Sequence, residues 1–141
     1  MIALSTDHAR LIRDSFARIA LRTLPLAESF YAELFRAHPE LRPIFPDRLD
    51  GLVMKLTDTM AFVTRTASDP ERLAQPLRDL AHRHKVYGVS AAQYELIGPV
   101  LLRTLAELDG AEMTEAELAA WDTAIQEITT FMARETVKAA A

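Results

Sequence analysis

Apolar residues recur along this sequence at the three- and four-residue spacing of an α-helix, and this spacing limits the possible folds more than any other feature. Between residues 27 and 35 the apolar positions follow the i, i+3, i+4, i+7, i+8 pattern of a helix buried along one face. Similar stripes run through residues 11–19, 49–63, 73–84, 94–108 and 118–135, and nowhere do apolar and polar residues alternate convincingly as in a half-buried strand. The pattern predicts an all-α protein with six main helices.

Prolines and capping residues mark where these helices are expected to begin and end. The second helix should stop at His38, because a residue that precedes proline is disfavoured in the helical region. Residues 39–45 are too short and too rich in proline for a full helix, so we expect a tight corner there. Asp69 followed by Pro70 is a strong helix start, with an N-cap and a proline in the first turn.

Further signals shape the second half of the chain. Pro76 should interrupt the helix that starts at Pro70 and divide it into two short pieces, and Gly88 should end it. Pro99 should bend the following helix because it removes one backbone hydrogen bond. Two capping boxes are predicted, Ser90 with Gln93 and Thr114 with Glu117.

Length and composition agree with one soluble domain over residues 1–141. Half of the 141 residues are hydrophobic, which is enough for a real core, and the absence of cysteine excludes disulfides and thiolate metal sites. The net charge of −4 with interspersed signs argues against nucleic acid as the main partner. Neither a leader sequence nor an apolar stretch of membrane-spanning length is present, so we expect a cytoplasmic protein without a membrane partner.

Four histidines are available for site chemistry: His8, His38, His82 and His84. His84 follows two apolar residues by one helical turn and is predicted to point inward, whereas His82 follows Arg78 and Asp79 and is predicted to face solvent. An inward imidazole needs partners, because an unpaired buried polar group costs about 1–3 kcal/mol. A metal on one ring nitrogen with a hydrogen bond on the other meets this need, and so does a simple hydrogen bond to a carbonyl.

Three further polar side chains lie on apolar stripes. Tyr31 and Tyr94 are either core aromatics whose hydroxyls reach a backbone acceptor or the surface, or groups that face a site. Glu135 continues the last apolar stripe, and an unpaired carboxylate is rarely buried, so it either lies in an exposed last turn or lines a cavity. Together they suggest a cavity inside the bundle.

Two segments resemble the globin family, specifically the bacterial single-domain haemoglobins and the globin domain of flavohaemoglobins. Residues 30–45 read FYAELFRAHPELRPIF, similar to the family's FYxxLFxxHPExRPLF, and residues 83–94 read RHKVYGVSAAQY, similar to its (R/K)HxxxGVxxxxY. The Ala120-Trp121 pair also resembles the last helix of that family. The resemblance covers nearly the whole chain and implies a globin fold of six to seven main helices around a haem pocket.

The resemblance implies a role for individual residues. His84 would be the proximal ligand of the haem iron, the protein's metal ligand. Phe45 would pack on the haem face, Tyr31 would donate to the bound gas, and Tyr94 would lie beside the proximal histidine. Phe30 and Leu52 would line the distal side with Tyr31. The further haem contacts would be Leu56, Leu80, Val89 and Ile97, with Lys55 and Arg83 as partners for the propionates.

Two positions depart from the family pattern. Leu52 stands where glutamine is common, in the register set by Lys55-Leu56, which leaves Tyr31 as the main distal donor. The proximal glutamate of the family aligns with Thr136 if the last helix has no gap, although Glu135 lies near the same face. No catalytic residue is therefore assigned with certainty, and Tyr31, Tyr94 and Glu135 are the candidates.

The function implied by the resemblance is that of a haem b globin that reversibly binds or transports dioxygen at five-coordinate iron, with nitric oxide and carbon monoxide as further ligands. One alternative is a nitric oxide dioxygenase that detoxifies with a separate reductase, because 141 residues leave no room for a flavin domain. Another alternative is a haem-based gas sensor or interaction module. A monomer or a homodimer is expected.

Overall fold

The computed structural model describes residues 4–108 and 111–140, with side chains up to residue 137. This part of the chain contains α-helices and short 3-10 helices but no strand, which confirms the all-α prediction. In chain order the elements are α1 (Thr6–Ile19), η1 (Ala20–Arg22), α2 (Thr23–Ala37), η2 (Pro39–Ile44), α3 (Asp50–Thr66), α4 (Pro70–Val86), α5 (Ala91–Glu107) and α6 (Glu115–Ala140). None of the described helices is long and apolar enough to cross a membrane.

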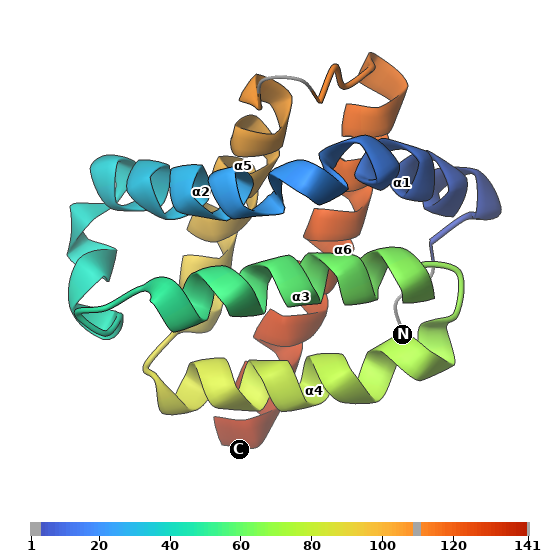
Figure 1. Cartoon of the computed structure of the whole chain (residues 1–141). Coiled ribbons are helices and arrows are strands. Elements are labelled where there is room, and N and C mark those ends of the chain that lie inside the picture. The colour runs from blue at the N-terminus through green and yellow to red at the C-terminus, as the bar shows by residue number, and fades with distance from the viewer. Residues whose placement is uncertain (1–3, 109–110, 141) are drawn as a thin grey trace.

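The helices form two layers that cross each other (Figure 1). In the front layer α1 and α2 run in line above α3, and α3 lies above α4. Behind them α5 and α6 run across this direction, with α6 packed against α1, α4 and α5, and α5 packed against α2. The corner η2 and the end of α4 lie on the same side of the molecule, so both quoted motifs contribute to one end of the bundle.

The predicted start signals are confirmed. The Asp69 carboxylate accepts from the backbone N–H of Arg72 at 3.3 Å, and both bonds of the Ser90 capping box are formed. In the second box the backbone N–H of Glu117 donates to the Thr114 hydroxyl at 3.1 Å, and the backbone N–H of Thr114 donates to Glu117 Oε1 at 3.0 Å. Short-range hydrogen bonding therefore sets where α4, α5 and α6 begin.

The predicted ends are also observed. Helix α2 stops before His38, whose φ of −135° and ψ of 70° are not helical, and the corner forms a 3-10 helix. Helix α4 stops before Gly88, which has a φ of +97°, a left-handed conformation that side chains with a Cβ rarely adopt. This turn brings the chain back from α4 to α5 and sets Val89 against the core.

The interpretation of Pro76 as a break is wrong. Helix α4 runs without interruption from Pro70 to Val86. Pro76 is exposed and deprives the carbonyl of Arg72 of its helical partner, while Leu73 and Leu77 on the same helix are buried in the core. The apolar anchors therefore outweigh one missing hydrogen bond. Helix α5 also continues through the exposed Pro99, and the bend expected there stays a prediction.

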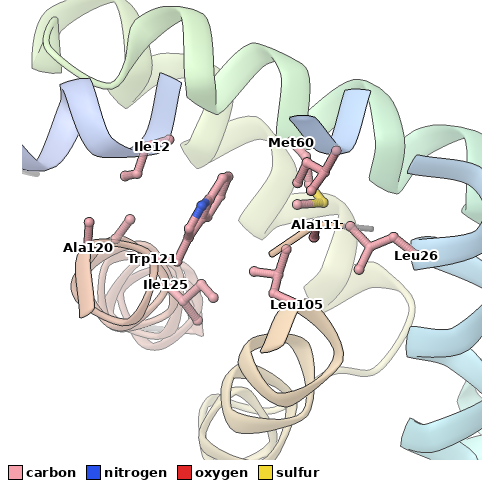
Figure 2. Packing of buried hydrophobic residues seen from close by; sticks show 10 residues of the cluster. Ile12, Leu26, Met60, Leu105, Ala111, Ala120, Trp121 and Ile125 are labelled. Carbon is pink, nitrogen blue, oxygen red and sulfur yellow. The ribbon is translucent and has the colours of Figure 1, made fainter. Parts of the chain in front are cut away.

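The largest apolar cluster joins α1, α2, α3, α5 and α6 (Figure 2). Its buried side chains include Ile12, Leu26, Met60, Leu105 and Ile125, packed around the indole of Trp121. The indole N–H donates to the buried Ser15 hydroxyl at 2.8 Å, and this bond links residues 106 positions apart. Burial of each large aliphatic side chain contributes about 1.5–3 kcal/mol, so this cluster stabilises the bundle away from the expected site.

Candidate functional site

The imidazole of His84 lies in the last turns of α4 and is half-buried. Its Nδ1 lies 2.8 Å from the backbone oxygen of Leu80. Because a carbonyl oxygen can only accept, Nδ1 carries the proton, and the neutral ring presents the lone pair of Nε2. Burial, followed by the charge of Arg83, lowers the pKa of His84 despite the opposing effect of the Leu80 bond. A neutral imidazole held in this way is able to bind a metal through Nε2.

Tyr94 of α5 lies beside this imidazole. The two ring centroids are 6.0 Å apart with planes tilted by 35°. Tyr94 packs with Ala81, Val89 and Met132, and its hydroxyl is a buried polar atom without a hydrogen-bond partner in the described structure. Burial raises the pKa of Tyr94, with a smaller opposing effect from Thr136.

Thr136 interacts with the Tyr94 hydroxyl through its side chain. Thr136 is buried and donates its own hydroxyl proton to the backbone oxygen of Met132 at 2.9 Å. Glu135 approaches α4 instead, with its Oε1 3.6 Å from Nε of Arg78. Its side chain is 20% exposed, so this carboxylate is neither in a frayed turn nor fully buried. A proximal role of Glu135 stays a prediction.

Tyr31 of α2 lies among three phenylalanine rings. Its centroid is 5.0 Å from that of Phe30, 6.2 Å from that of Phe35 and 6.1 Å from that of Phe45. Its hydroxyl donates to the backbone oxygen of Leu52 at 3.5 Å, a long hydrogen bond. Burial raises the pKa of Tyr31 to about 12, so the phenol stays protonated and able to donate at neutral pH.

The structure collects most of the predicted site residues in two apolar clusters. The first, here called the distal cluster, contains Phe30, Tyr31, Phe45, Leu52, Leu56 and Ile97 among its members. The second, the proximal cluster, contains Leu80, Val89 and Tyr94. Ile44 packs against both clusters, a role that sequence reasoning missed although this residue precedes Phe45 in the quoted motif. Lys55 and Arg83 are exposed, and their pairing with an anionic group stays a prediction.

The described residues around His84 offer few further metal ligands. Among the described residues no group of three or more His, Asp or Glu side chains could hold a bare ion. His84 could thus supply a metal with one imidazole ligand, and the described residues around it do not complete a coordination sphere. This arrangement fits a planar metal complex bound between apolar side chains, with the protein supplying one axial ligand.

Comparisons with known proteins concern the fold and the family of the chain. A family model described as Globin matches residues 28–132. The flavohemoprotein of Rhizobium meliloti is 30% identical over 114 residues, which are 79% of this chain and 28% of that protein. The chain spans about a third or less of the length of the curated relatives it matches.

Two solved structures share the fold over nearly the whole chain. A bacterial globin from Campylobacter jejuni is 22% identical with a TM-score of 0.85, covering 96% of this chain and 99% of that one. An engineered carbene transferase, made from a candidate nitric oxide dioxygenase of Rhodothermus marinus, is 24% identical with a TM-score of 0.88, covering 98% and 96%. The predicted arrangement of helices is thereby confirmed.

Proposed function

The chain belongs to the globin family, and we propose that it binds haem with His84 as the iron ligand and takes up a diatomic gas reversibly. When bound, haem supplies an iron that can coordinate dioxygen, nitric oxide or carbon monoxide on the face opposite the histidine. The observation that carries this proposal is the neutral His84 ring, whose Nδ1 bonds the Leu80 oxygen and whose Nε2 is left to a metal. The name of the flavohemoprotein relatives supports the same cofactor.

The chain's part in gas binding is to exclude water and to offer one hydrogen-bond donor. Phe30, Phe45, Leu52, Leu56 and Ile97 would form the apolar distal wall, while Leu80 and Val89 would pack on the proximal side. A donor in a site without water has a stronger electrostatic effect than the same donor in solution. The Tyr31 phenol, protonated and held by a long bond to Leu52, can turn toward a bound gas that carries partial negative charge.

We propose haem b as the form of the cofactor, with its propionates paired to the exposed cations Lys55 and Arg83. Covalent attachment through thioether bonds needs cysteine, and the sequence contains none. We also propose that residues 1–141 form a single globin domain. The same proposal includes a cytoplasmic location and a monomeric or homodimeric state. Fractionation of cells and light scattering of purified protein test the last two points.

Replacement of the ligand tests the proposal. His84→Ala should lose haem on gel filtration and regain it when imidazole is added. His82→Ala is the matched control, because His82 is exposed two residues away on the same helix and should keep haem. Haem bound to the folded state also raises stability by mass action, so unloaded His84→Ala protein should not respond to hemin in thermal unfolding. Equal haem retention in both variants would contradict the proposal.

Oxidation of nitric oxide is a second candidate. The name of the flavohemoprotein relatives favours it, because it joins the haem to a flavin, a group that can deliver the electron consumed in each turnover. Conversion of one nitric oxide and one dioxygen to nitrate consumes one electron, which a separate reductant must supply. Tyr94 and Glu135 would be the further residues of interest for such turnover. Rapid mixing of the dioxygen-loaded protein with nitric oxide, followed by assay of nitrate and of re-reduction by a flavin reductase, distinguishes turnover from simple binding. Stoichiometric nitrate without re-reduction would leave gas binding as the function.

A further inference from the structure

Arg42 makes several contacts within the corner between α2 and α3. Its Nη1 donates to the backbone oxygens of Phe45 at 3.2 Å and Pro46 at 3.0 Å, and its Nη2 donates to that of Asp47 at 3.1 Å. These three carbonyls belong to successive residues that follow η2 and precede α3. A planar guanidinium can reach several acceptors at once, because its donors are arranged in a fixed fork.

The same guanidinium also contacts an aromatic ring. Its carbon lies 5.1 Å from the ring centroid of Phe35 in α2, a cation–π distance. The Phe35 ring in turn meets the Phe45 ring edge-to-face at 5.0 Å. Arg42 therefore binds Phe45 from two directions, through its backbone oxygen and through the ring on which the side chain of Phe45 packs.

Phe45 is one of the rings that fix Tyr31. Their centroids are 6.1 Å apart with planes at 71°. The hydrogen bond from the Tyr31 hydroxyl to Leu52 is long, at 3.5 Å, and restrains the phenol only weakly. The orientation of the hydroxyl consequently depends on the packing of its neighbouring rings, and Phe45 is the neighbour that comes from the corner.

We propose that Arg42 is a positioning residue of the distal side, which holds Phe45 against Tyr31 and so fixes the direction of the Tyr31 hydroxyl. Arg42 touches no gas itself and acts through Phe45. Its consequence for gas binding rests on the proposed haem site, while its effect on Phe45 does not.

The first test needs no haem and uses the full chain as purified. In Arg42→Met the amide of Phe45, which donates to the Arg42 backbone oxygen at 3.1 Å, should exchange with solvent at least several-fold faster, and the contacts between the Phe45 and Tyr31 rings in NMR should weaken. Arg48→Met is the matched control, because Arg48 is exposed on the same corner and its Nη2 lies 3.2 Å from the exposed carboxylate of Asp50. Unchanged exchange and ring contacts in the Arg42 variant would overturn the proposal.

The second test asks whether Arg42 acts through Tyr31. In the wild-type background Arg42→Met should speed dioxygen release roughly threefold to tenfold, the range for a weakened hydrogen bond. In a Tyr31→Phe background the same change should alter release by less than about twofold, because the group that is positioned is absent. Equal acceleration in both backgrounds would refute the coupling, since loss of general stability does not depend on the Tyr31 hydroxyl.

A conservative variant keeps the test valid if Arg42→Met does not fold. Arg42→Lys retains the charge but replaces the planar fork by a compact ammonium, so we expect intermediate values of Phe45 exchange and dioxygen release. Full wild-type behaviour of Arg42→Lys would contradict the role of the fork. A wild-type chain that takes up no haem would refute the proposed function, and the Phe45 exchange result would still decide the inference about Arg42.

Discussion

Replacement of Tyr31 by phenylalanine separates the function of its hydroxyl from its part in the fold. The ring would remain among Phe30, Phe35 and Phe45, so the packing of the distal cluster should be kept. The hydroxyl makes a hydrogen bond to Leu52 at 3.5 Å, beyond the usual range of strong bonds, and it is buried at a desolvation cost. We therefore expect Tyr31→Phe to change the free energy of unfolding by less than about 1 kcal/mol.

The effect on a bound gas should be much larger. A hydrogen bond to an atom with developed negative charge is worth about 1–3 kcal/mol, which corresponds to roughly five- to 150-fold in the rate of release. The assay is displacement of dioxygen by carbon monoxide in stopped flow, with urea unfolding of the same preparation as the measure of stability. An unchanged release rate together with unchanged stability would show that the Tyr31 hydroxyl does not reach the ligand.

Three further predictions concern stability. Ser15→Ala should cost about 1–3 kcal/mol in urea unfolding, because it leaves the buried Trp121 N–H without its acceptor; a neutral change would contradict this. Gly88→Ala should cost about 1 kcal/mol from the left-handed backbone alone, since no atom lies within 4 Å of an added Cβ; a gain in stability would refute the strain. Burial raises the pKa of Glu117, but Arg18 and the hydrogen bonds at the start of α6 outweigh this and lower the pKa below its ordinary value. Ionised Glu117 should therefore add to the free energy of unfolding above the ordinary glutamate pKa. This stabilisation should be lost as the pH falls through the lower folded value. Glu117→Gln should remove that part of the acid dependence in unfolding experiments, and an unchanged pH profile would contradict the assignment.

Signals within three or four residues were sufficient to predict the helix ends. The capping boxes at Ser90 and Thr114 use partners three positions away, and Gly88 is needed because the turn itself has a positive φ. The same local reasoning was wrong for Pro76, because whether a proline breaks a helix depends on which face is buried, and tertiary packing decides that. Local sequence could not reveal the bond between Trp121 and Ser15, which joins distant parts of the chain.

For the site, helical spacing alone predicted the inward direction of His84 and the apolar surroundings of Tyr31. The roles of individual residues came from the resemblance to globins, since the spacing fits a carbonyl-bonded core histidine equally well. The structure adds which groups meet: Thr136 lies beside Tyr94 while Glu135 approaches Arg78. Glu135 and Thr136 are adjacent on α6, so their side chains point in directions about 100° apart. An apolar stripe is about as wide as this angle, and it therefore cannot show which of the two residues faces Tyr94.

Titration of the purified chain with hemin tests the central claim most directly. We predict a Soret band that grows until hemin and protein are equimolar, a five-coordinate spectrum after reduction, and a shift on addition of carbon monoxide. A chain that stays colourless after hemin is added, with no Soret absorption beyond that of free hemin, would contradict the account and leave His84 as a histidine bonded to a helix carbonyl.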